Sequence, residues 1–163
     1  MSDSNSDQDL FIIKESLKAS GLAVDLNDEE LTDLAKIAIA RNYKKGADIV
    51  SEGSTSRDLF IIQKGNVSIC LTLPMIYFKE EVISHLKESE IFGEFSLANG
   101  MPRSATVKAE GKVTVHQYPY EKLIALMEQQ TRIGYIVMRN LAGIIANRIR
   151  DNHKKTRKLM LGW

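Results

Sequence analysis

A carboxylate and a guanidinium stand close together on a segment that two glycines can bend sharply. The segment, residues 91–107, reads IFGEFSLANGMPRSATV and contains Glu94 and Arg103. Gly93 lets the chain leave a strand, after which residues 94–97 can form one helical turn whose free backbone N–H groups attract an anion. Gly100 can adopt a positive φ and return the chain. We therefore expect an amide-rich turn, an acid and an arginine to face one space.

The two charged side chains suggest a particular ligand chemistry. Arg103 offers a planar fork of five N–H donors, which suits bidentate contact with a phosphate. Ionised Glu94 only accepts hydrogen bonds, so it pairs with a hydroxyl or a cation. A phosphate beside a hydroxyl describes a cyclic ribose phosphate. The alternative is a surface ion pair, since such pairs are common and weak, but the glycines and the Pro-Arg-small order of residues 102–105 disfavour it.

The elements that must position this segment are mostly strands. The hydrophobic period changes to two from Asn42, and Val67, Ile69 and Leu71 give residues 66–73 one apolar face, as in a half-buried strand. Short strands are expected over residues 48–51, 58–64, 66–73, 81–86, 90–92, 106–109 and 112–118. Many short strands between turn residues predict an α+β fold built on a closed antiparallel β-roll, similar to a jelly roll.

Helices are predicted on both sides of the roll. Leu10, Ile13 and Leu17 have helical spacing, which predicts a helix over residues 10–19. A second helix should begin at Asn27, with Glu30 as its capping-box partner. The buried stripe of this second helix is predicted to be Leu31, Leu34 and Ala38. After the roll, two more helices are predicted over residues 119–127 and 131–155.

The expected domain organisation is simple. Residues 1–9 are predicted as a disordered leader, residues 10–155 as one domain and residues 156–163 as a basic tail. Within the domain, the roll covers about residues 42–118 and the C-terminal helices cover 119–155. A chain of 163 residues is long enough for a substantial core.

Composition excludes several classes of protein. The net charge of +1 points neither to nucleic acid binding nor to an acidic tail. Cys70 is the single cysteine, which excludes an internal disulfide and suits a reducing compartment. The polar start lacks the features of a secretory signal, and no apolar run approaches the roughly 20 residues that span a bilayer. We expect a cytoplasmic protein without a membrane span.

Two separated segments resemble the cyclic-nucleotide-binding domain family, which includes protein kinase A regulatory subunits and the bacterial catabolite activator protein. FGEFSLANGMPRSATV is similar to the phosphate-binding cassette of that family in order and spacing. KKGADIVSEGSTSRDLFIIQKGNVSI, residues 44–69, carries three glycines where the family turns between strands. The resemblance covers roughly residues 30–155, and two motifs in the right order are more specific than one glycine pattern.

The resemblance implies roles for individual residues. It gives Glu94 the ribose 2′-hydroxyl and Arg103 the exocyclic phosphate oxygens, with backbone amides near Ser96 and Ser104 completing the anion site. The cassette residues expected around the ligand are Gly93, Glu94, Phe95, Ser96, Arg103, Ser104 and Ala105. Ser104 does not decide the base, because relatives that prefer cAMP and relatives that prefer cGMP both place a hydroxyl there. We favour cAMP and leave cGMP open.

Residues outside the cassette are expected to complete the site. Ile83 and Leu86, with Ile69 opposite, would contact sugar and base, although ordinary core packing is the alternative for these three. The resemblance also implies that the last helix covers the base, which places Asn152 and His153 at its edge. Both side chains can hydrogen-bond a purine.

The function expected is that of a non-catalytic sensor with no cofactor or metal, which passes binding on through its last helix to an effector protein that the sequence does not identify. His85, His116 and His153 are scattered and include no His-x-His pair, which disfavours a metal enzyme. The remaining alternative is a degenerate family member that serves as a dimerisation or docking module without nucleotide.

Other partners follow from the C-terminal region. Leu141, Ile145, Ile149, Asn152, Thr156 and Leu159 have the spacing of a pairing seam, so a homodimer is possible, with packing on the chain's own roll as the equal alternative. No helix-turn-helix pattern follows the last helix, so direct sequence-specific DNA binding is not expected. The basic cluster at residues 154–158 fits a solvated helix end, with contact to nucleic acid as the less favoured alternative. The apolar loop at residues 74–78 is a candidate partner surface.

Overall fold

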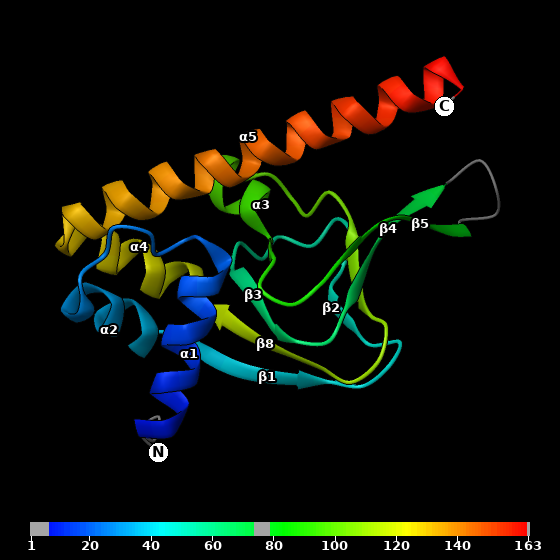
Figure 1. Cartoon of the computed structure of the whole chain (residues 1–163). Helices are drawn as coiled ribbons and strands as arrows, with labels where there is room; N and C mark the ends of the chain where they lie inside the picture. The colour runs from blue at the N-terminus through cyan, green and yellow to red at the C-terminus, as the bar shows by residue number, and fades with distance from the viewer. Residues whose placement is uncertain (1–6, 74–78, 163) are drawn as a thin grey trace.

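A computed structural model describes residues 7–73 and 79–162 as a β-roll with helices before and after it (Figure 1). Two helices, α1 (Asp7–Ser20) and α2 (Asp28–Lys36), precede the roll. The short α3 (Glu94–Asn99) interrupts it, and α4 (Tyr120–Gln129) and α5 (Thr131–Leu161) follow it. The loop predicted at residues 74–78 lies outside the described residues.

The strands form two antiparallel sheets. One has the order β1-β8-β3-β6, made of β1 (Ile39–Tyr43), β8 (Val113–Tyr118), β3 (Leu59–Lys64) and β6 (Ile91–Phe92). The other has the order β2-β7-β4-β5, made of β2 (Asp48–Val50), β7 (Thr106–Ala109), β4 (Val67–Leu73) and β5 (Lys79–Leu86). The predicted jelly-roll-like architecture is therefore confirmed.

Strand β3 is buried on both faces, which explains its uninterrupted apolar run. Phe60 and Ile62 point into the core between the sheets. Leu59 and Ile61 point to the opposite face and pack beneath the helices. Because successive side chains of a strand alternate between faces, one strand serves both cores.

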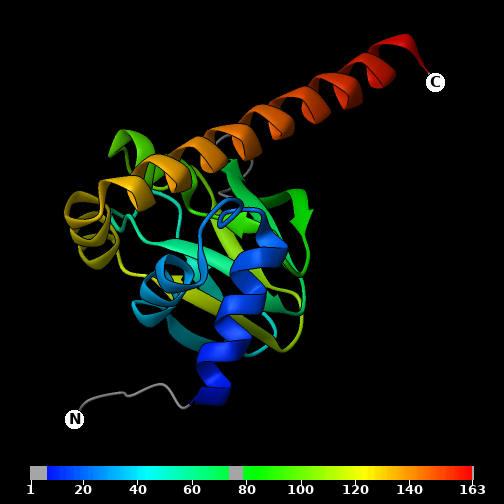
Figure 2. The same ribbon diagram turned by 60° about the vertical axis from the view of Figure 1, so that its left-hand side comes forward.

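The helical layer covers the outer face of the first sheet. The first half of α5 packs there through Ile133, Val137 and Leu141, each buried in the same core as the residues of α1, α2 and α4. From residue 151 to residue 162 every side chain is exposed. Figure 2 shows this end of α5 extending past the body of the domain.

The sequence predicted seven of the strands to within two residues at each end but missed β1. The three central residues of β1 are exposed, so the strand shows no alternating apolar signal. The capping box of α2 is confirmed, because Asn27 Oδ1 accepts from Glu30 N and Asn27 N donates to Glu30 Oε2, both at 2.9 Å. Ala38, predicted on the stripe of this helix, follows its end.

The two ends of the chain depart from the predicted boundaries. Helix α1 begins at Asp7, inside the predicted leader, and residues 1–6 lie outside the described part of the chain. Helix α5 continues through the predicted basic tail to Leu161, because residues 144–161 contain neither glycine nor proline. Gly162 ends the helix with a φ of 67°, a left-handed conformation that suits glycine.

Candidate functional site

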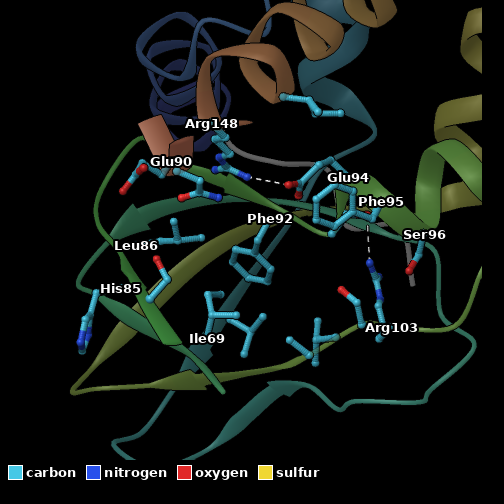
Figure 3. Close-up of a pocket in the computed structure, with 18 of the residues that line it drawn as sticks. Ile69, His85, Leu86, Glu90, Phe92, Glu94, Phe95, Ser96, Arg103 and Arg148 are labelled. Carbon is cyan, nitrogen blue, oxygen red and sulfur yellow. Dashed lines mark hydrogen bonds and ion pairs between the residues drawn. The ribbon is translucent and has the colours of Figure 1, made fainter. Parts of the chain in front are cut away.

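A cavity of about 330 Å³ lies between the β-roll and α5. Strand residues form its floor, the segment around α3 forms one side, and α5 covers it (Figure 3). Its apolar lining consists mainly of Val50, Ile69, Leu86, Phe92, Val107, Ile145 and Ile149. Its polar lining includes Glu94, Ser96, Arg103, Ser104, Arg148 and Asn152. A cavity that is mostly apolar and has a few convergent charges is typical of a small-molecule site.

Gly93 allows the chain to turn from β6 into α3. Its φ of 89° is a conformation that side chains with a Cβ rarely adopt. A Cβ there would lie 2.5 Å from the carbonyl oxygen of Asp58 and 2.8 Å from Arg103 Nη1. The close approach brings α3 and Arg103 to the same side of the cavity. The predicted single helical turn and the positive φ of Gly100, 68°, are both confirmed.

Arg103 is buried and anchored by three hydrogen bonds. Its side chain donates to Ser56 Oγ at 3.1 Å, to the Gly93 carbonyl at 3.0 Å and to the Asp58 carbonyl at 2.7 Å. These bonds use one N–H of each guanidinium nitrogen, so the second N–H of each terminal nitrogen remains for a ligand. Burial lowers the pKa of Arg103, and the nearby Asp58 and Glu94 partly oppose that shift. An arginine stays charged under such conditions and can attract an anion.

The loop between β2 and β3 holds the backbone of Arg103. Gly53 N donates to the Arg103 carbonyl, and Arg103 N donates to the Ser54 carbonyl, each at 2.8 Å. The same loop provides Ser56 and Asp58 for the side chain. The upstream glycine motif and the cassette are thus one structural unit.

Glu94 is paired with a residue that sequence reasoning did not single out. Arg148 Nη1 donates to Glu94 Oε1 at 2.7 Å, and Arg148 Nη2 donates to the Ile91 carbonyl. The Glu94 side chain is 6% exposed, so its charge needs such a partner. In Figure 3, Arg148 and Arg103 lie on either side of Glu94. The sequence could have indicated Arg148 through its spacing, because it lies four residues after Ile144 and three after Ile145 and so shares their inward face of the helix.

The apolar floor brings aromatic rings next to the charged residues. Phe92 lines the cavity and stacks on Phe60, with ring centroids 4.8 Å apart and planes 7° from parallel. The Arg103 guanidinium lies 5.8 Å from the centre of the Phe60 ring. The stack therefore supports both the floor and Arg103.

The structure brings most of the predicted site residues together. Those that line the cavity are Gly93, Glu94, Phe95, Ser96, Arg103, Ser104, Ala105, Ile69, Leu86 and Asn152. Residues that the sequence did not indicate include Val50, Glu90, Phe92, Val107, Ile145, Arg148, Asp151 and Lys155. The sequence contains no local pattern that indicates most of these residues, because their place in the cavity depends on a distant strand or on the rotation of α5 about its axis.

Ile83 and His153 lie outside the cavity lining. Ile83 is 57% exposed. Ser84 and Leu86 line the cavity, and side chains alternate between the two faces of a strand, so Ile83 points to the opposite face. Ile69 pairs with Ser84 and Cys70 with Val82, which makes Ile83 the extra residue of a β-bulge. His153 follows Asn152 on α5 and is exposed on a different side of the helix.

A metal site and a membrane span are two other features that the described residues could contain. Within residues 7–73 and 79–162, no group of three or more His, Cys, Asp or Glu side chains is arranged to hold a metal ion. His85 is at the rim and contacts Glu110. His116 is 2% exposed, and burial lowers its pKa to about 4. Among the helices that the structure describes, none has the length and apolar character needed to cross a bilayer.

Comparisons with known proteins point in one direction. The family model of the cyclic nucleotide-binding domain matches residues 40–130. A cAMP-dependent protein kinase regulatory subunit from Eremothecium gossypii is 30% identical over 99 residues, which are 61% of this chain and 20% of that protein. Glutaminase 1 from Bradyrhizobium diazoefficiens is 32% identical over 124 residues, which are 76% of this chain and 19% of that protein.

The chain therefore spans about a fifth of the length of these two relatives. Among solved structures, a cyclic nucleotide-binding domain from Methylobacillus flagellatus has a TM-score of 0.80 and 22% identity. That similarity covers 90% of this chain and 83% of the other, and it shows a shared fold.

Proposed function

This chain belongs to the cyclic nucleotide-binding domain family, and we propose that it is a regulatory module that binds a purine 3′,5′-cyclic mononucleotide without converting it chemically. Cyclic AMP is the favoured ligand and cGMP is the second candidate. The observation that carries the proposal is the placement of buried Arg103 and buried Glu94 on one cavity of about 330 Å³.

The phosphate would bind beside Arg103. Two of its N–H groups remain for phosphate oxygens after its contacts with Ser56, Gly93 and Asp58. The backbone amides at the start of α3, near Ser96, have no partner within the helix because of their position and can add donors. A buried cation and several amides would stabilise a singly charged cyclic phosphate.

The ribose would bind at Glu94. Arg148 occupies one oxygen of this carboxylate, and the second oxygen can accept a hydrogen bond from the 2′-hydroxyl. The sugar and base would then lie on the apolar floor formed by Ile69, Leu86 and Phe92. Ile83 does not belong to this floor, since it faces outward.

The base would lie beneath α5, where Asn152 supplies an amide that can both donate and accept hydrogen bonds. The proposed output passes through the same helix, since a ligand that contacts α5 favours the position of α5 in which those contacts form. An effector protein would read that position. The proposed site for this reading is the exposed part of α5 after Ile149.

Pairing of two copies through α5 is a second element of the proposal, and the surface for it is limited to the C-terminal end of the helix. Leu141 is buried in its own domain, and Ile145, Ile149 and Asn152 line the cavity. Thr156 and Leu159 are the predicted seam residues that are exposed and do not line this cavity. Sedimentation at high micromolar concentration, with and without cAMP, tests the pairing; a monomer under both conditions refutes it.

Calorimetric titration with cAMP, cGMP and a cyclic dinucleotide tests the central proposal. We expect cAMP to bind with one site per chain, and we expect Arg103→Ala to weaken binding by roughly 2–5 kcal/mol, because a desolvated phosphate loses its charge partner. Circular dichroism must show that this variant is folded, since Arg103 also holds the loop at residues 53–58. Equal affinity in wild type and Arg103→Ala would refute the phosphate site. Failure of all three nucleotides to bind would favour the docking module without nucleotide.

A further inference from the structure

Arg57 lies between the cassette helix α3 and the first residue of α4. Its Nε donates to the Ser96 carbonyl and its Nη2 donates to the Leu97 carbonyl, both at 3.0 Å. Its Cζ lies 4.0 Å from the centre of the Tyr120 ring. One guanidinium therefore contacts two helices that are separated in the sequence by β7 and β8.

The contacts of Arg57 fix the position of α3. Helix α3 has six residues, and a helix of this length is not stable without tertiary contacts. A cation at the last carbonyls of a helix is favourable. Gly100, which ends α3 with a φ of 68°, lies directly beside the guanidinium, since a Cβ at this position would be in ordinary van der Waals contact with Arg57 Cζ at 3.6 Å.

Asp58 makes a second connection to the same two places. Its Oδ1 accepts from Tyr120 N at 2.8 Å, at the start of α4. Its backbone carbonyl accepts from Arg103 Nη2 at 2.7 Å. The consecutive residues Arg57 and Asp58 thus connect α3 and Arg103 to the first turn of α4.

We propose that Arg57 is a positioning residue that couples the anion site to α4. Because the Arg57 guanidinium is bonded to α3 and packs on the Tyr120 ring, α3 and the first turn of α4 shift together. Filling the anion site then stabilises the start of α4, and loosening α4 weakens the anion site, because coupling between two sites is reciprocal. The ligand part of this inference rests on the proposed function, whereas the contact between α3 and α4 does not.

The ligand-free test uses amide hydrogen exchange. Tyr120→Leu removes the ring, and Tyr120→Phe keeps it as the matched control. We expect Tyr120→Leu to speed exchange of the Gly100 amide, which closes α3 on the Ser96 carbonyl, by about tenfold, the size of a partly desolvated cation–π contact. Tyr120→Phe should exchange like wild type. Unchanged exchange of Gly100 in Tyr120→Leu would overturn the coupling.

The second test uses Arg57→Met, which keeps the aliphatic length and removes the charge and the fork, with Arg57→Lys as the conservative variant. At saturating cAMP, wild type should protect the Leu123 amide, which donates to the Pro119 carbonyl in the first turn of α4. Arg57→Met should lose this protection and bind cAMP about tenfold more weakly. Arg57→Lys should restore part of both. Full protection of Leu123 in saturated Arg57→Met would overturn the inference.

The two tests separate this inference from the proposed function. If wild type does not bind cAMP, the proposed function fails, and the ligand-free comparison of Tyr120→Leu with Tyr120→Phe still decides whether α3 and α4 are coupled. If wild type binds cAMP and Arg57→Met keeps the wild-type response of α4, the coupling alone fails. If Arg57→Met does not fold, Arg57→Lys and Tyr120→Leu decide whether α3 and α4 are coupled, because each variant retains part of the contacts between Arg57, α3 and Tyr120.

Discussion

Arg148 on α5 and Glu94 at the start of α3 form an ion pair of 2.7 Å that ties the last helix to the cassette. The side chain of Glu94 is 6% exposed and that of Arg148 is 27% exposed. Movement of α5 away from the roll would leave the Glu94 carboxylate buried without this partner, which is costly. The position of α5 and the residue proposed to bind the ribose are therefore linked.

The first prediction concerns this pair. Arg148→Met should weaken cAMP binding by roughly 1.5–3 kcal/mol, the size of a hydrogen bond to a charged group, because Glu94 is no longer held toward the ligand. The loss should be much smaller for 2′-deoxy-cAMP, which does not offer the hydroxyl to Glu94. Calorimetry of both ligands measures the difference.

Arg150→Met is the matched control, since Arg150 is an exposed arginine on the same helix and does not line the cavity. It should bind both ligands like wild type. An equal loss for cAMP and 2′-deoxy-cAMP in Arg148→Met would show that Arg148 supports the fold rather than the orientation of Glu94.

The second prediction separates two neighbouring residues of α5. Asn152 lines the cavity and His153 does not. Asn152→Ala should change the ratio of cAMP to cGMP affinities, because a side chain at the base edge contributes a hydrogen bond of about 1 kcal/mol that depends on the base. His153→Ala should leave the ratio unchanged. A change in the ratio for His153→Ala, with none for Asn152→Ala, would mean that α5 rotates on binding.

The third prediction concerns the glycine before α3. Gly93→Ala should destabilise the protein by roughly 1–3 kcal/mol, because alanine strains a φ of 89° and its Cβ would overlap the Asp58 carbonyl and Arg103. Binding of cAMP should weaken as well, since both neighbours hold the anion site. Urea denaturation and calorimetry measure the two effects.

Gly143→Ala is its control. A Cβ at this glycine in α5 meets no atom within 4 Å, so alanine should stabilise the protein by about 0.5–1 kcal/mol through its helix propensity. Normal affinity and stability in Gly93→Ala would indicate that the turn into α3 relaxes easily.

The fourth prediction concerns pH. His116 is 2% exposed, its Nδ1 has no hydrogen-bond partner among the described residues, and burial lowers its pKa from 6.5 to about 4. Below pH 6.5 the unfolded chain therefore binds a proton that the folded chain does not bind until the pH approaches 4. The free energy of unfolding should fall across this window by up to roughly 3 kcal/mol.

His116→Phe should flatten this part of the stability profile, while His153→Phe, at an exposed position, should not. Urea denaturation at several pH values between 4 and 7 measures both slopes. A wild-type profile that is flat from pH 6.5 to 5 would show that His116 does not titrate as its burial requires.

The cassette was accessible from the sequence because its signals are local. Gly93 and Gly100 provide the two positive φ values around α3, and Glu94 and Arg103 lie on the same short segment, so residue types and spacing were sufficient to place them together. The capping box of Asn27 and Glu30 is local in the same sense. Alternation along β4 and the apolar run of β3 likewise predicted the strands. The half-buried character expected of β4 was wrong, because Ser68 and Cys70 on its second face are buried as well.

Tertiary structure decided the contacts that depend on distant elements. The β-bulge at Ile83 comes from the register between β4 and β5, and neither strand shows it alone. Strand β1 is held by pairing with β8, although its own residues are mostly exposed. Register depends on the partner strand and on packing, so a single segment cannot specify it.

The covering of the site was also a tertiary result. The rotation of α5 places Arg148 and Asn152 over the cavity and leaves His153 outside it, and this rotation is set by the packing of Ile133, Val137 and Leu141 on the core. The junction at Arg57 and Asp58 joins segments separated by about forty to sixty residues. The sequence thus determined which residue types could bind a cyclic nucleotide, whereas the fold determined which of them meet, because hydrogen bonds and packing between distant segments form only when the whole chain has closed around them.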